Sequence, residues 1–182
     1  MWILGIDPGL GMTGLCLLDP DGVPKAAACL KAEGPEQVDL VRYSRLSCGV
    51  SDALIKWCRL FSIDELMIGI EYPVMKASNV VNYRKQASTI AIMELQLVGE
   101  FSVDYLVEVN PTEVKKAATG RGDATKAEII KASPLTGSGK AVEAMADAWA
   151  VAVAACDAPI VKRIVVSNLD HIPYGTEAEV IF

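Results

Sequence analysis

The sequence is poor in the residue types from which disulfide frameworks, zinc sites and serine- or cysteine-based active sites are built. Its 182 residues include one histidine and five cysteines, and no two cysteines form a CxxC pair. An odd and scattered set of cysteines indicates neither a disulfide framework nor a zinc site, and it favours a reducing compartment. The single histidine, His171, has no Ser or Cys pattern beside it, so a Ser-His or Cys-His mechanism has little support.

A long apolar run and a targeting segment are also missing. The longest uninterrupted apolar run, residues 148–156, is far too short to span a bilayer. The first residues do not show a basic segment followed by an apolar stretch and a small-residue cleavage site. We therefore expect a cytoplasmic protein that has no membrane partner.

Basic residues are a minority, but they are concentrated in the middle of the chain. Lys and Arg number 17 against 23 Asp and Glu, and the net charge of −6 weighs against nonspecific attraction to polyanions. Residues 75–93 nevertheless carry three basic residues and no acid, and residues 111–131 carry five basic residues and three acids. An anionic partner should therefore dock on these two stretches.

Apolar residues are abundant, at 52% of the chain, which is enough for one domain with a substantial core. Short apolar runs between Gly-, Pro- and Asp-rich turns predict strands over residues 2–7, 13–18, 25–31, 65–70 and 103–109. Helical periodicity and alanine content predict helices over residues 37–61, 77–99, 113–119, 125–132 and 138–157. Thr112 and Ser138 are the predicted caps of the third and last helices.

This order of elements predicts an α/β fold with a mixed five-stranded sheet flanked by α-helices. The domain would occupy residues 1–157. Residues 158–182, which include a β-like patch KRIVVSNL, would form a C-terminal extension to which the sequence assigns no role.

Three acids interrupt otherwise apolar elements: Asp7 in the first strand, Glu71 at the end of the fourth, and Asp147 in the last helix. Singly, each is more simply explained as an acid at an element edge that reaches solvent or caps a backbone N–H. Together they indicate more. If the first and fourth strands are neighbours, Asp7 and Glu71 lie side by side, and a helix packed across the sheet could bring Asp147 to the same point.

Converging carboxylates without basic neighbours repel one another, and a divalent cation removes the conflict. Oxygen-only ligands favour Mg²⁺ or Mn²⁺ over zinc, and a pair of such ions is the usual arrangement for in-line phosphoryl transfer. Glu143 lies one helical turn before Asp147 and therefore on the same helical face. The acids thus favour a divalent-metal site of the kind used for phosphoryl transfer.

Four segments together resemble the RuvC-type Holliday junction resolvases, which have the ribonuclease H fold. They are GIDPGLGMTGLCLLD, IEYPVMKASNVVNYRKQAS, NPTEVKKAATGRGDATK and EAMADAWAVA, in the order and rough spacing of that family. The resemblance covers about residues 2–157. It implies a ribonuclease H-like fold and two Mg²⁺ ions in each active site, with Mn²⁺ as a substitute.

The resemblance also implies roles for individual residues. Asp7, Glu71 and Asp147 would be metal-binding catalytic acids. Lys115 and Lys126 would contact the scissile phosphate or neighbouring DNA and support the chemistry. Further basic residues are candidate DNA contacts: Lys76, Arg84, Lys85, Lys116 and Arg121. On the residues alone, a solvated helix face is the second interpretation of Lys115 and Lys116, whereas DNA contact and plain surface explain Arg84 and Lys85 equally well.

Two positions depart from the family pattern. The family often has an acid or a histidine three residues before the last aspartate, where this chain has Ala144. Glu143 is a candidate fourth metal ligand, although it would point about 100° away from the usual direction. The family also often places an aromatic wedge for the branch point after its second acid. Tyr72 is the available aromatic here, with Val74 and Met75 as alternatives.

The resemblance implies a metal-dependent endonuclease that resolves four-way DNA junctions by paired symmetric nicks, leaving 5'-phosphate and 3'-hydroxyl ends. Two symmetric cuts need two sites, so we expect a homodimer, with residues 77–99 as its face unless that helix is buried against its own sheet. The motifs carry no information on a helicase partner. The alternatives are a broader branched-DNA nuclease, a noncatalytic junction-binding protein and, disfavoured by the chain length, an actin-like nucleotide-binding ATPase.

Overall fold

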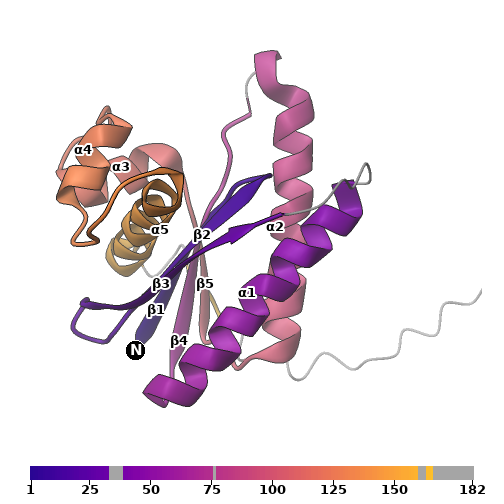
Figure 1. Ribbon diagram of the computed structural model, residues 1–182, viewed down its shortest axis with the longest axis vertical. Coiled ribbons are helices and arrows are strands. Elements are labelled where there is room, and N and C mark those ends of the chain that lie inside the picture. Colours follow the sequence, from indigo (N-terminus) through magenta and orange to yellow (C-terminus); the bar gives the residue numbers. More distant parts are fainter. Residues whose placement is uncertain (33–38, 76, 160–162, 166–182) are drawn as a thin grey trace, which may run out of the picture.

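The first strand of the chain lies in the interior of a mixed sheet, where it pairs with strands on both sides (Figure 1). The computed structural model describes residues 1–32, 39–75, 77–159 and 163–165. Its strands are β1 (Trp2–Pro8), β2 (Met12–Leu18), β3 (Pro24–Lys31), β4 (Leu66–Glu71), β5 (Tyr105–Val109) and β6 (Arg163–Val165). Their order across the sheet is β3-β2-β1-β4-β5-β6. β1 is antiparallel to β2 and parallel to β4. The sheet therefore combines an antiparallel part, β1 to β3, with a parallel part that begins at β1 and β4.

Helices cover both faces of the sheet (Figure 1). One face carries α1 (Asp39–Phe61) and α2 (Val80–Glu100), with a 3₁₀ turn (Ala77–Asn79) before α2. The other face carries α5 (Lys140–Asp157), beside which pack α3 (Pro111–Thr119) and α4 (Lys126–Ala132). The core therefore has two parts, one on each face of the sheet. Because side chains of a strand alternate between the faces, Leu4 and Ile6 of β1 pack under α1 and α2, whereas Ile3 packs under α5.

Glycines let α5 lie unusually close to the sheet. A Cβ atom at Gly5 would overlap the backbone oxygen of Ala148, and one at Gly14 would overlap the backbone oxygen of Ala144. A Cβ at Gly69 would meet the Ala155 side chain. Glycine is the only residue that permits such an approach, and the alanine-rich face of α5 supplies the complementary small side chains. This contact fixes the height of α5 above β1, β2 and β4.

The predicted mixed five-stranded sheet flanked by helices is confirmed, and a sixth strand extends it. β6 pairs antiparallel with β5, so part of the predicted C-terminal extension belongs to the sheet. The predicted end of the domain at residue 157 coincides with the end of α5. Within the described part of the chain, no helix combines the length and the apolar character needed to cross a membrane. Lys76, a predicted DNA contact, and His171 lie outside the described residues.

The predicted caps were wrong at two helices. Asn110, not Thr112, caps α3: its side-chain oxygen accepts hydrogen bonds from the N–H groups of Thr112 and Glu113, both at 3.0 Å. The helix can begin at Pro111 because a proline at the first helical position loses no hydrogen bond. Gly139, not Ser138, precedes α5, and it makes no side-chain cap.

Candidate active site

The acids that interrupt the apolar elements line one cavity of about 340 Å³. Asp7 comes from the end of β1, Glu71 from the end of β4, and Asp147 from α5. The complete lining is Asp7, Glu71, Pro111, Val114, Lys115, Ala124, Thr125, Lys126, Ile129 and Asp147. The structure therefore brings together three acids and two lysines that are far apart in the sequence.

Sheet register explains why the two strand acids are neighbours. β1 and β4 are parallel, and Ile6 of β1 pairs with Ile70 of β4. The next residue of each strand is Asp7 and Glu71, so the two carboxylates follow side by side at the carboxyl ends of the strands. Side chains alternate between the faces of a sheet, and the residue two positions before Asp7, Gly5, faces α5. Both acids therefore face the helix that carries Asp147.

Burial and mutual repulsion make the strand acids hard to ionise. Burial, followed by the charge of Asp147, raises the pKa of Asp7 to about 7, while Lys126 opposes the rise. Burial, followed by the charges of Asp7 and Asp147, raises the pKa of Glu71 to about 8, and Lys115 and Lys126 oppose that rise. The two lysines therefore compensate the acids only in part, and the cavity attracts further positive charge.

An ion pair joins Lys126 to the acid of α5. The Nζ atom of Lys126 lies 2.7 Å from Oδ2 of Asp147, whose side chain is 15% exposed. Burial works against the charge on Lys126, but the hydrogen bond and charge of Asp147, with the charges of Asp7 and Glu143, hold its pKa above the usual value. Lys126 thus supplies positive charge at the mouth of the acid cavity.

The donor set suits a hard divalent cation. In the ranges that the structure describes, no three His, Cys, Asp or Glu side chains are grouped closely enough to form a metal centre by themselves. The chemistry of the cavity nevertheless fits Mg²⁺ or Mn²⁺, because its acids offer only oxygen ligands. A cation would also favour the ionised forms of Asp7 and Glu71, whose pKa values burial raises. Asp147 would then be shared between the cation and Lys126.

Glu143, the candidate fourth ligand, and Ala144, at the position where the family often has a ligand, have different surroundings. Glu143 is not among the residues that line the cavity, although its charge acts on Lys126. Ala144 is buried, and its backbone oxygen is packed against Gly14 of β2. The position at which the family often has an acid or histidine is therefore part of the close contact between α5 and the sheet.

The three residues considered for the branch-point wedge separate into one partly buried and two exposed side chains. Tyr72 packs against the core under α1 and α2, and its hydroxyl donates a hydrogen bond to Glu94 of α2. Val74 and Met75, in the loop that follows β4, are 49% and 64% exposed. The loop therefore presents aliphatic residues and holds its aromatic residue inside.

The predicted DNA contacts are spread over several surfaces. Lys115 lines the acid cavity beside Lys126, whereas Lys116 lines a second cavity of about 330 Å³ between α3 and the end of α5. Arg84 is exposed on α2, and Lys85 of the same helix is ion-paired at 2.8 Å with Asp39 at the start of α1. The structure thus does not gather all of these residues at one place.

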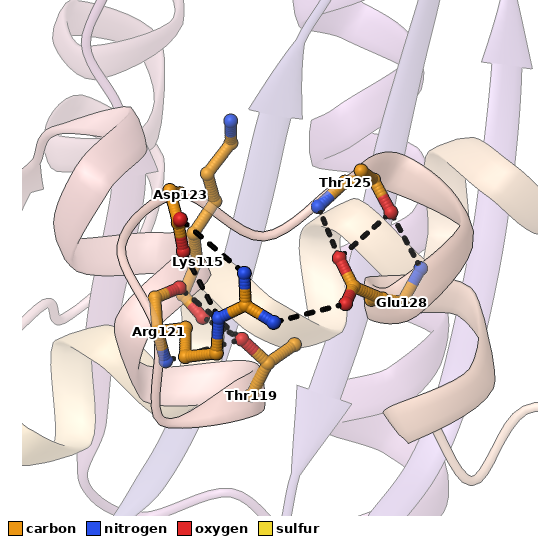
Figure 2. Close-up of polar contacts among 6 residues, drawn as sticks. All are labelled: Lys115, Thr119, Arg121, Asp123, Thr125 and Glu128. Atoms are coloured by element: carbon orange, nitrogen blue, oxygen red, sulfur yellow. Dashed lines mark hydrogen bonds and ion pairs between the residues drawn. The ribbon is translucent and has the colours of Figure 1, made fainter.

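Arg121 lies in the connector between α3 and α4, where its guanidinium meets two carboxylates (Figure 2). It is paired with Asp123 at 3.1 Å and with Glu128 at 3.4 Å. The acids belong to the same connector and to α4. The side chain predicted to contact DNA is therefore already engaged within the protein.

Two capping boxes that the sequence predictions do not include hold the starts of the lysine-bearing helices. Thr125 lines the cavity and forms a capping box with Glu128 at the start of α4, and Asn110 forms another with Glu113 at the start of α3. The spacing of a short polar residue followed three positions later by Glu is a known signal for such a start. This signal is present in NPTE and TKAE, so both caps could have been found.

Comparison with known proteins gives a consistent result over nearly the whole chain. The family model described as crossover junction endodeoxyribonuclease RuvC matches residues 3–156. The crossover junction endodeoxyribonuclease RuvC of Sulfurovum sp. is 31% identical over 159 residues, which cover 84% of this chain and 93% of the relative. That of Synechococcus sp. is 27% identical over 139 residues, covering 72% of this chain and 81% of the relative.

Solved structures share the fold at lower identity. The Thermus thermophilus RuvC structure matches with a TM-score of 0.60 and 22% identity, over 85% of this chain and 92% of that chain. The structure of T. thermophilus RuvC in complex with Holliday junction substrate matches with a TM-score of 0.59 and 18% identity, over 85% and 91%. The arrangement of sheet and helices is therefore the ribonuclease H-like fold of these structures.

Proposed function

The chain belongs to the RuvC family of crossover junction endodeoxyribonucleases, and we propose that it resolves four-way DNA junctions by metal-dependent hydrolysis in the cavity that holds Asp7, Glu71 and Asp147. The observation that carries this proposal is the convergence of these acids with Lys115 and Lys126 on one cavity. A related structure was solved with a Holliday junction substrate, which supports branched DNA as the substrate class.

Asp7, Glu71 and Asp147 would hold Mg²⁺, for which Mn²⁺ would substitute, as a pair of ions. The bound cations supply an activated water and charge compensation for the leaving oxygen. The three side chains fit this role because they are buried oxygen donors whose own repulsion is relieved by positive charge. Hydrolysis of this kind leaves 5'-phosphate and 3'-hydroxyl ends.

Lys115 and Lys126 would contact the scissile phosphate at the rim of the cavity. An ammonium group binds phosphate as a point charge and does not read the base sequence, which suits an enzyme that selects a structure. Lys126 would exchange its contact with Asp147 for one with the phosphate when DNA is bound. Lys116 and Arg84 would add contacts to the DNA backbone from neighbouring surfaces.

The wedge for the branch point is assigned to the exposed pair Val74 and Met75. Tyr72 is held by the core and by Glu94, so it would have to leave both partners to reach DNA. Met75 has a flexible apolar side chain and follows Glu71 by four residues along the chain. An aliphatic wedge can unstack a base step without aromatic stacking on a base.

A homodimer follows from the need for two symmetric cuts. One face of α2 carries exposed residues at alternating spacings of three and four: Val81, Arg84, Ser88, Ala91 and Leu95. Val81 and Leu95 are 67% and 77% exposed. This spacing is typical of a helix that packs against a second helix, and we propose that α2 meets its symmetry mate in a cytoplasmic homodimer.

A panel of DNA substrates tests the proposed function. Purified protein is incubated with four-way, three-way, flap and linear duplex DNA in Mg²⁺, in Mn²⁺ or in chelator. We expect paired nicks in the four-way junction with either metal and none in chelator. Equal cutting of all branched substrates would favour the broader nuclease, and binding without cutting in both metals would contradict the proposal.

A further inference from the structure

The connector at residues 120–125 joins the two helices that carry the cavity lysines, and Arg121 is its most connected side chain (Figure 2). Nε and Nη2 of Arg121 donate hydrogen bonds to the two carboxylate oxygens of Asp123 at 3.1 and 3.2 Å. Nη1 donates to Oε1 of Glu128 at 3.4 Å. The guanidinium therefore bridges the connector to α4 through a fork of hydrogen bonds.

Glu128 passes this restraint to the start of α4. Its second carboxylate oxygen accepts hydrogen bonds from the backbone N–H of Thr125 at 2.7 Å and from the Thr125 hydroxyl at 2.8 Å. Thr125 caps α4, and the next residue is Lys126, whose ammonium reaches Asp147. Fixing Glu128 therefore fixes the turn from which Lys126 extends.

The backbone of Arg121 is tied to the end of α3. The hydroxyl of Thr119 donates to the backbone oxygen of Lys115 at 2.8 Å, and the N–H of Arg121 donates to that hydroxyl oxygen at 3.3 Å. Gly120 closes the helix in the left-handed region, at φ 80°. One residue thus connects the end of the helix that carries Lys115 with the start of the helix that carries Lys126.

The charges around Arg121 argue against a DNA contact. Its side chain is 61% exposed, but it faces two carboxylates. The hydrogen bonds and charge of Arg121 hold the pKa of Asp123 below its usual value, and the Thr125 contacts, with Arg121, lower that of Glu128. Both acids are therefore ionised at neutral pH. A phosphate at this place would meet two negative charges beside one positive charge.

We propose that Arg121 is a positioning residue, which clamps α3 to α4 so that Lys115 and Lys126 are held over the acid cavity. This inference rests on the proposed function of that cavity. Isolated surface ion pairs contribute little, but a bidentate Arg–carboxylate pair with a second acid belongs to the exceptions. A displacement of about 1 Å at a reacting centre can lower a rate by about a hundredfold, so a loosened connector should be visible in the rate of cleavage.

Arg121→Lys and Arg121→Gln separate the clamp from a phosphate contact. The guanidinium makes a fork that an ammonium cannot reproduce, whereas a phosphate accepts either cation. We expect both variants to lower the single-turnover cleavage rate at saturating protein by about tenfold. Junction affinity in chelator, and the slope of log affinity against log salt, should match those of the unchanged protein.

Glu128→Gln is the second variant, because it removes the charge at Arg121 and retains a side chain that can form the capping box. We expect the same loss of rate, with no further loss when it is combined with Arg121→Gln. The thermal midpoint of each variant is measured in parallel, so that a rate is interpreted only for folded protein.

Two results would overturn the inference. Wild-type rate in Arg121→Lys, together with a salt slope lower by about one in Arg121→Gln, would identify a phosphate contact. Unchanged rate and affinity in all variants would show that the network is a dispensable surface feature. If the unchanged protein cuts no junction in Mg²⁺ or Mn²⁺, the proposed function itself fails, and that result is seen before any variant is tested.

Discussion

Among single residues, Asp7 and Glu71 have the environment that departs most from the usual one for an acid. They lie side by side at the ends of two parallel strands, and Asp147 faces them from α5. Lys115 and Lys126 offset only part of this negative charge. Acids in this state are poor stabilisers of a fold, and the proposed cations would relieve their repulsion.

The first prediction concerns the pH dependence of the metal-free protein. The folded-state pKa values are about 7 for Asp7 and about 8 for Glu71, whereas both lie near about 4 in an unfolded chain. Between these values the folded state binds more protons than the unfolded state, so the free energy of unfolding falls as pH rises. We expect the thermal midpoint in chelator to fall from about pH 5 to about pH 8.5, and Mg²⁺ to restore it at the upper end.

Asp7→Asn provides the control for this prediction. The amide keeps the shape of the side chain and cannot ionise, so the variant should lose less stability than the unchanged protein over the same pH range. Its thermal midpoint should also respond less to Mg²⁺. Parallel curves for the two proteins would show that Asp7 does not carry the effect.

At the scale of elements, the contact between α5 and the glycines of the sheet sets the position of Asp147. Gly5 and Gly14 leave no room for a Cβ atom beneath the backbone of α5. The helix therefore lies close enough for Asp147 to reach the cavity that the strand acids line. A larger residue at either glycine would lift the helix and its acid together.

The second prediction is that Gly14→Ala lowers the free energy of unfolding by about 3 kcal/mol, because the added methyl group must displace α5. Urea unfolding measures the loss. Gly99→Ala in α2 is the matched control, because the added Cβ would meet no packed neighbour outside its own helical turn within 4 Å and alanine favours a helix. That variant should be as stable as the unchanged protein or slightly more so. Equal stabilities for the two variants would refute close packing as the reason for Gly14.

Much of this architecture could be predicted from the sequence because it depends on local pattern. Strand alternation and helical periodicity predict the strands and helices, and the order of elements predicts the mixed sheet. Thr112 also fits a cap, but the capping-box spacing from Asn110 to Glu113 and the position of Pro111 both favour Asn110. The ion pair between Lys126 and Asp147 depends on how α4 meets α5, which no local pattern specifies.

The same limit explains the residues whose surroundings differ from expectation. The predicted roles of Tyr72, as the wedge, and of Lys85 and Arg121, as DNA contacts, rest on residue type and position along the chain. Their partners are Glu94, Asp39 and the pair of acids beside the connector, all of which are brought near by folding. A sequence shows which charges exist, but the fold decides which of them are already neutralised.

For the whole molecule, the acid cavity and the exposed stripe of α2 lie on opposite faces of the sheet. The α5 side carries the acid cavity, while α2 on the other side presents an exposed stripe with the spacing of a helix–helix contact. Pairing through α2 would leave both cavities of the proposed dimer uncovered, as the proposed paired cuts require.

The third prediction is that Leu95→Glu converts the proposed dimer to a monomer, because it places a charge within the proposed contact between two copies of α2. Sedimentation velocity measures the change. The monomer should still bind junctions, but its nicks should become uncoupled from each other. Leu60→Glu on α1, at a side chain that is 72% exposed, is the control and should leave the dimer intact. A monomeric unchanged protein would contradict the proposed interface.

The central claim, that the carboxylates of one cavity perform the cleavage, is tested most directly by single-turnover cutting of a synthetic four-way junction in Mg²⁺. The proteins compared are the unchanged chain, Asp7→Asn, Glu71→Gln and, as the matched control, Asp52→Asn at an exposed acid of α1. Junction binding is measured for each in chelator. We predict that Asp7→Asn and Glu71→Gln bind the junction and do not cut it, while Asp52→Asn does both. Cutting that survives in both cavity variants would contradict the account.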